Sequence, residues 1–384
     1  MAMENATSGL YPQQGQHKFQ QMLEELPPWI WRGRRNILPG NWNPNRWTLG
    51  FGEYDDLPLI EIDDRNYITG NTRVDEPSAD CLAFESACRD GPLSTLEAVT
   101  SSRPRTPAFL HQGLLIAIRV GNVDAAQYLL EKGAPIVRCT ARNILWTPPE
   151  KQIPIGEVLL VHGWNPNTPD IVDCYLLPEV ITNLPFLRWL LTHAGADPNI
   201  GKIGPEKYDF EGRETNGSCE SLEKAACDGH LEAMHLLLDA GANINNGFPL
   251  HAAAGSDIYY ENGHRRGRPS EPSPSPEVRK EFEERQIAIM SLLIERGVDI
   301  NQEQRVVMGN MVPAYPVLEA IWAQSIQRAQ WLIEQGANLE VTGGYGPAME
   351  IAELTRNPEM TKVVEEGIRA RRWVKKDAEK AIGE

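Results

Sequence analysis

Apolar and polar positions along this chain recur in a fixed order. Six times, a leucine-rich stretch ends at a glycine and a short polar turn follows. The six glycines are Gly133, Gly163, Gly195, Gly241, Gly297 and Gly336. Successive glycines are 30, 32, 46, 56 and 39 residues apart. A spacing of about 33 residues with insertions predicts a solenoid of short helical units rather than one globular core.

The residues before the clearest leucine stretches predict a second, inner helix in each unit. Ser221–Met234 leads into the stretch that ends at Gly241, and Phe248–Gly255 opens the next unit. Pro249 and Pro316 suit the first turn of an inner helix, because proline has no N–H to leave unpaired there. We therefore expect repeated helix–turn–helix units.

In these units the chain resembles the ankyrin repeat family, most clearly over residues 217–340. The family pattern is Thr-Pro-Leu-His, paired alanines, Gly-His, a leucine triplet and Gly-Ala-Asx-x-Asn. His251 matches the first motif, Gly229 and His230 match the turn, and Phe248 and Tyr315 replace the family's threonine. The resemblance implies an all-α ankyrin-repeat solenoid of stacked helix-turn-helix units with hairpin-like loops. It implies roughly eight repeats over residues 77–366.

The recurrent glycines and Asx residues are expected in turns, because their backbone and side-chain properties suit turn conformations. Gly91, Gly121 and Gly229 are expected in the tight turns between paired helices, and the six terminal glycines in the left-handed ends of outer helices. The recurring Asx pairs are expected to form turns, since one pair per repeat cannot share a calcium ion. These pairs are Asp197 and Asn199, Asn243 and Asn245, and Asp299 and Asn301. The proline-rich segment Thr140–Ile155 predicts no long inner helix in the third repeat.

Two N-terminal segments lie outside the repeats. Residues 1–20 contain few aliphatic side chains, which predicts disorder. Residues 21–76 contain four tryptophans among arginines: Trp29, Trp31, Trp42 and Trp47. We expect this segment to cap the first repeat, because a solenoid must cover its terminal apolar face. Stacking of these rings on single-stranded bases is the alternative.

Two further segments depart from the repeat pattern. Residues 256–280 are polar and proline-rich, which predicts a flexible insertion inside one repeat. Ser273 and Ser275 each precede proline there and are candidate phosphorylation sites, with an unmodified insertion as the alternative. The basic residues 367–384 predict a C-terminal capping helix or tail, and a nuclear import signal is the other interpretation.

Composition limits the function classes. The formal net charge of −16 argues against phosphate-backbone binding as the main activity. The sequence contains neither a membrane-spanning apolar stretch nor a signal peptide, so we expect an intracellular protein of the cytoplasm or nucleus. The cysteines form no C-x-x-C pair and are expected to be reduced, mostly buried thiols. They are Cys81, Cys88, Cys139, Cys174, Cys219 and Cys227.

Catalytic motifs are not found in the sequence. There is no phosphate loop, no G-x-S-x-G elbow and no H-E-x-x-H motif. His230 and His235 are five residues apart on a predicted helix and point to different faces, which disfavours a shared metal ion. We expect no enzyme activity, no small-molecule substrate, no cofactor and no metal site.

The remaining hypothesis is a non-catalytic protein-interaction scaffold or adaptor. The resemblance implies a concave face built from inner helices and hairpin tips. It places Arg119, Lys224, Asp228, Glu319 and Trp322 on inner helices, and Trp146, Trp164, Tyr315 and Tyr345 at tips. Trp322 is the leading candidate, since large aromatic side chains dominate binding energy. A packed contact with the neighbouring inner helix is the alternative for this residue. The alternative is a nuclear regulator that contacts nucleic acid through the N-terminal Trp/Arg segment and the basic tail.

Overall fold

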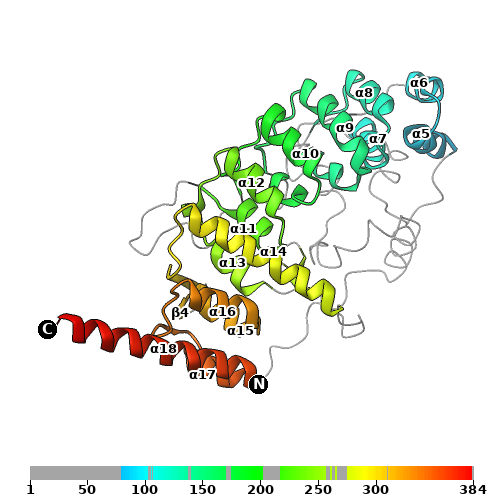
Figure 1. Ribbon diagram of the computed structural model, residues 1–384. Coiled ribbons are helices and arrows are strands. Elements are labelled where there is room, and N and C mark those ends of the chain that lie inside the picture. Colours follow the sequence, from blue (N-terminus) through cyan, green and yellow to red (C-terminus); the bar gives the residue numbers. More distant parts are fainter. Residues whose placement is uncertain are drawn as a thin grey trace, which may run out of the picture. The chain divides into compact units, whose positions relative to one another are not determined.

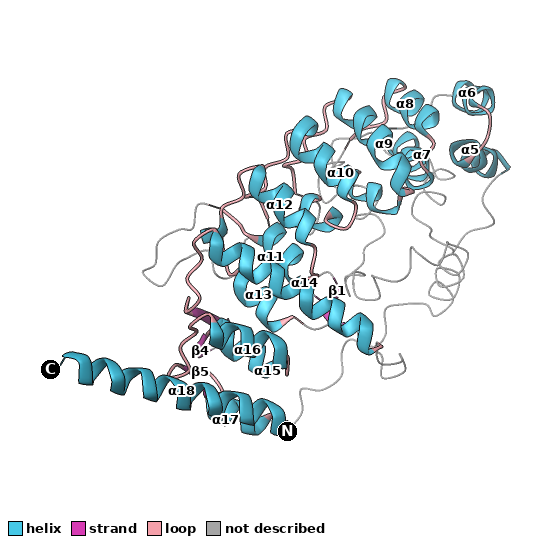
Figure 2. Ribbon diagram, in the orientation of Figure 1, coloured by secondary structure: helices cyan, strands magenta, loops and turns pink. Residues whose placement is uncertain are grey.

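Helices dominate the described part of the chain (Figure 2). The computed structural model describes residues 79–102, 105, 107–136, 140–169, 174–201, 217–256, 260–261, 264–265, 275–308 and 310–382. The chain forms two compact units, Met1–Asp173 and Cys174–Glu384. The predicted segments 1–20 and 21–76, and Ser273, lie outside the described residues.

The described part of the first unit consists of three helix pairs. They are α5 (Ala79–Arg89) with α6 (Leu93–Ser101), α7 (Pro107–Val120) with α8 (Val123–Glu131), and η2 (Ala141–Trp146) with α9 (Pro149–Val161). The inner helix α7 contacts both α5 and η2, while α8 contacts both α6 and α9. Inner and outer helices therefore form two parallel rows.

The second unit continues the same plan with five described pairs. They are η3 (Leu177–Val180) with α10 (Leu184–Trp189) and the π-helical turn η4 (Leu190–Ala194), α11 (Glu220–Cys227) with α12 (Leu231–Asp239), α13 (Pro249–Gly255) with α14 (Pro276–Glu295), α15 (Pro316–Trp322) with α16 (Ile326–Glu334), and α17 (Ala348–Leu354) with α18 (Pro358–Ile382). Successive inner helices contact one another, as do successive outer helices. Figure 1 shows α11 to α18 following one another in chain order through this unit.

Short antiparallel strands occur in the loops of the second unit (Figure 2). The longest hairpin pairs β3 (Gln304–Met308) with β4 (Asn310–Ala314), and a shorter one pairs β5 (Thr342–Gly343) with β6 (Gly346–Pro347). Strands β1 (Tyr260–Glu261) and β2 (His264–Arg265) lie in the insertion, and the 3₁₀ turn η5 (Ile244–Asn246) precedes α13. The predicted hairpin-like loops are thus paired strands at two repeat junctions.

The six recurrent glycines end outer helices in a left-handed backbone conformation, as predicted. Their φ angles lie between 75° at Gly195 and 97° at Gly336. An added Cβ would meet no atom within 4 Å at any of the six. The backbone angle, and not lack of space, therefore requires glycine at these positions.

The turns between paired helices use the same conformation with more varied residues. Gly121 and Gly229 have φ angles of 74° and 75°, as expected for tight turns. Gln324 and Arg356 take the corresponding place after α15 and α17, with φ angles of 57° and 55°. Gly91 differs from the prediction. Its φ is not positive, and an added Cβ would lie 2.6 Å from the Cα of Ala87, so crowding is the constraint there.

The Asx pairs form turns, as the sequence indicates. In each pair the first side chain accepts a hydrogen bond from the backbone N–H two residues later: Asp197 from Asn199, Asn243 from Asn245, and Asp299 from Asn301. Asn199 Oδ1 also accepts from the backbone N–H of Asn243 at 2.7 Å, in the next repeat. The polar turns therefore also connect neighbouring repeats.

The third repeat has the 3₁₀ helix η2 as its inner element, and Pro154 lies inside the outer helix α9, in agreement with the expected absence of a long inner helix. The predicted insertion 256–280 is too long at its C-terminal end, because α14 begins at Pro276. Ser275 caps that helix and accepts a hydrogen bond from Val278 N, which starts the helix earlier than its apolar residues indicate.

Candidate partner-binding surface

The largest exposed aromatic side chains of the described inner-helix and hairpin face belong to Trp322 and Tyr345. Trp322 is the last residue of α15 and is 49% exposed, while Tyr345 lies between β5 and β6 and is 67% exposed. Their rings stack with centroids 4.7 Å apart and an interplanar angle of 5°. Repeat packing thus brings together two predicted binding residues that are 23 positions apart. We call them the aromatic pair.

The backbone holds both rings of the aromatic pair in place. Gln324 lies in the turn that follows α15 and has a left-handed backbone conformation. Its N–H donates to the carbonyl oxygen of Ile321. On the other side, the β5–β6 hairpin packs against β4, and Gly344 N donates to Pro313 O at 3.0 Å. Because ordered elements carry both rings, little conformational entropy remains to be lost when a ligand covers them.

Glu319 lies one helical turn before Trp322, on the same side of α15. Its side chain is partly buried against Gly255 at the end of α13, and burial raises the pKa of its carboxyl group. No described residue donates a hydrogen bond to this carboxylate. A cation brought near Glu319 would favour the charged form of its carboxyl group and oppose the effect of burial.

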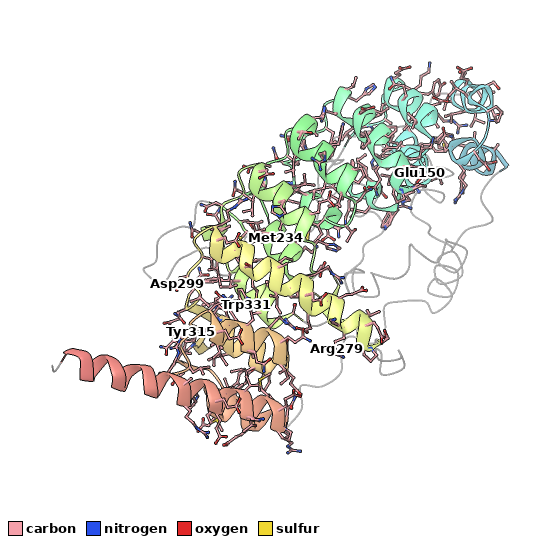
Figure 3. All side chains as sticks on the ribbon, in the orientation of Figure 1. Glu150, Met234, Arg279, Asp299, Tyr315 and Trp331 are labelled. Carbon is pink, nitrogen blue, oxygen red and sulfur yellow. The ribbon has the colours of Figure 1, made fainter. Side chains whose placement is uncertain are left out.

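Tyr315 serves the fold as well as the surface. It precedes the first residue of α15 (Figure 3), and its hydroxyl donates to Glu303 Oε2 at 3.0 Å. The bond joins the start of the inner helix to the segment before β3. Tyr315 is partly buried, so only part of its ring is accessible.

In the first unit the predicted residues Arg119 and Trp146 lie together. The Arg119 guanidinium lies 4.4 Å from the centroid of the Trp146 ring, and its Nε donates to Asn143 Oδ1 at 2.7 Å. Both side chains are partly buried and contact each other.

The expectation that Trp164 is accessible at a tip is wrong. That side chain is 6% exposed, and its backbone N–H donates to Leu159 O in the helix-ending turn.

Lys224 and Asp228, both predicted on the inner face, are partly buried at α11. The Lys224 Nζ pairs with Glu179 Oε1 at 3.1 Å, and Asp228 is the C-cap residue of α11. The charge of Lys224 is thus balanced inside the protein.

The second unit contains a buried polar network that the repeat pattern does not predict. The Arg328 side chain of α16 is 1% exposed and pairs with Glu283 of α14, with Nε 2.8 Å from Oε2. Ser325 also donates to that carboxylate. Repeat patterns gave no signal for this network, because Arg328 and Glu283 are 45 residues apart.

The predicted cysteines and the basic tail lie partly within the described residues. The described free cysteines are Cys88, Cys174, Cys219 and Cys227, and burial raises the pKa of Cys88 and Cys227 to about 12. In the basic tail, Arg371 of α18 donates to the carbonyl oxygen of Gly336 and to Asn338 Oδ1, as a capping helix would. No cluster of metal-binding side chains occurs within the described ranges. No described helix is long and apolar enough to cross a membrane.

Ankyrin repeat domains are among the solved structures to which this chain is similar. One is the ankyrin repeat domain of human ASB11, with 18% sequence identity and a TM-score of 0.36, covering 66% of this chain and 82% of that chain. Another is the ankyrin repeat domain of Bcl-3, a member of the IkappaB protein family, with 17% identity and a TM-score of 0.36, covering 66% of this chain and 85% of that chain. No protein-family model matches the sequence, and no curated protein does.

The likeness concerns the fold alone. The class is defined by the repeat geometry of the chain itself: paired helices, left-handed terminal glycines and Asx turns that link neighbouring repeats. These are the features of an ankyrin-type repeat protein. Solenoids of this kind typically act through the extended surfaces that their stacked repeats present to other proteins.

Proposed function

We propose that this protein is a non-catalytic scaffold or adaptor that binds a partner protein on its inner-helix and hairpin face. The observation that carries the proposal is the aromatic pair, two large rings that are stacked, exposed and held by ordered backbone. Aromatic side chains that a partner can desolvate supply much of the energy of protein–protein interfaces. We place this activity in the cytoplasm or nucleus.

The proposed contact surface centres on Trp322 and Tyr345, with Glu319 beside them. Arg119 and Trp146 form a secondary candidate in the first unit, where their mutual contact would have to be kept or exchanged on binding. The nucleic-acid alternative rests on residues 21–76, outside the described ranges, and on a basic tail in which Arg371 already serves the fold. We therefore favour a protein partner.

The test compares proteins captured from cells by four forms of the chain. These are the wild type, Trp322→Ala, Tyr345→Ala and the control Val161→Ala, whose side chain is 81% exposed on the outer helix α9. Quantitative mass spectrometry should find partners that the wild type and the control retain and both aromatic variants lose. Identical captured sets for all four forms would contradict the proposal.

A further inference from the structure

We infer that the aromatic pair binds an arginine side chain of the partner, within a basic segment of its chain. This inference rests on the proposed function and specifies the chemistry of the partner. It begins with the open rings of Trp322 and Tyr345, which lie on the face built by α13, α15 and α17. Each of the stacked rings has an electron-rich face, and such a face attracts a planar cation.

The charged side chains within the three inner helices of this face have one sign. Helices α13, α15 and α17 contain three carboxylates, Glu319, Glu350 and Glu353, and neither lysine nor arginine. His251 of α13 is buried, and its pKa is lowered to about 4, so it is neutral near pH 7. The three inner helices thus present a negative field to a partner.

The carboxylates lie close to the rings. Glu319 is one helical turn from Trp322, and the Glu350 side chain lies against Gly346, the residue that follows Tyr345. Glu350 and Glu353 are exposed on α17. Each of the two repeats that supply the rings therefore also supplies a nearby carboxylate, Glu319 in one and Glu350 in the other.

Arginine fits this combination better than lysine does. A guanidinium group is planar, stacks on aromatic faces and donates in a fork that suits a carboxylate. An ammonium group is more strongly hydrated and cannot stack. Nucleic acid is disfavoured, because its phosphates would meet carboxylates instead of cations.

The experiment measures fluorescence anisotropy with three labelled peptides. The first alternates glycine and arginine, the second has lysine in place of arginine, and the third has neutral citrulline. We expect the arginine peptide to bind most tightly and the citrulline peptide most weakly. Trp322→Ala and Tyr345→Ala, which leave the net charge unchanged, should each weaken arginine-peptide binding by about tenfold.

Charge-matched variants complete the design. Glu350→Gln should weaken binding severalfold, whereas Glu334→Gln removes an exposed carboxylate from the outer helix α16 and should have no effect. Equal affinity of the arginine peptide for wild type and Trp322→Ala would overturn the inference, since it would reveal attraction to net charge alone. Equal affinity for the arginine and citrulline peptides would overturn it too.

The two proposals can fail separately. If Trp322→Ala loses its cellular partner but keeps its affinity for the arginine peptide, the arginine inference is wrong and the proposed function stands. If neither partner capture nor peptide binding responds to the aromatic variants, both proposals are wrong. Thermal unfolding of the two aromatic variants should remain cooperative and close to that of the wild type, because both rings are exposed.

Discussion

Arg328 of α16 caps Ala254 at the end of α13. Its Nη1 donates to the carbonyl oxygens of Ala254 and Ala253 at 2.7 and 2.8 Å. In the α15–α16 pair, Ser325 N donates to Ala320 O and closes the inner helix locally. At the end of α13, a side chain from the next repeat binds the corresponding carbonyl oxygens. The Arg328 network thus connects the α13–α14 repeat to the α15–α16 repeat.

Replacing Arg328 should strongly destabilise the folded protein. Arg328→Met leaves the buried Glu283 carboxylate without its partner and should lower the free energy of unfolding by about 3–5 kcal/mol. The measurement is urea-induced unfolding. The matched control is Lys280→Met in α14, the helix that also carries Glu283. This change breaks the exposed pair with Glu284 and should cost less than about 1 kcal/mol. Equal losses in the two variants would contradict this account.

A second prediction concerns Gln324, which adopts a left-handed conformation that costs most residues energy. Gln324→Gly should stabilise the protein by about 1 kcal/mol, because glycine adopts this conformation without strain. Ala323→Gly is the control. Ala323 has a helical φ of −69°, so glycine brings no relief there and should be neutral or destabilising. A stability gain at residue 323 but not at 324 would sink this interpretation.

The buried His251 predicts a dependence of stability on pH. Burial lowers its pKa from 6.5 to about 4, and its Nε2 lies 3.3 Å from Ala314 O. As the pH falls, the unfolded chain therefore takes up a proton before the folded chain does. Stability is fully retained above the unfolded pKa of 6.5 and decreases between there and pH 4, by up to roughly 3 kcal/mol.

The test is urea unfolding of the wild type and of His251→Leu, each measured at pH 7.5 and at pH 4.5. The variant should lose less stability over that interval. Part of the loss should remain, because burial lowers the pKa of His111 to about 3 and gives it the same sign of effect. If both proteins lose the same amount, His251 does not titrate as described.

Much of the fold could be predicted because its requirements are local. A glycine with a φ near 95° and an Asx side chain that accepts from the N–H two residues later each depend on a few neighbouring residues. The Arg328 network could not be predicted, since it joins residues 45 and 74 positions apart. Gly91 and Trp164 were misjudged for the same reason, because crowding and burial depend on packing that the repeat pattern leaves open.

The candidate surface was predicted only in part. Trp322 and Tyr345 were identified singly, from repeat position and residue type. Their stacking depends on how the β5–β6 hairpin meets the end of α15, which the sequence does not specify. The pairing of Lys224 with Glu179 likewise could not be predicted, because it joins side chains of two neighbouring repeats.

Site-specific photo-crosslinking in cells tests the central claim most directly. A photoreactive phenylalanine analogue at position 345, in the aromatic pair, is compared with the same group at position 161 on the outer helix α9. We predict a covalent adduct with a partner protein from position 345 that is absent from position 161 and disappears with Trp322→Ala. No adduct from position 345, or equal adducts from both positions, would contradict a binding role for this face.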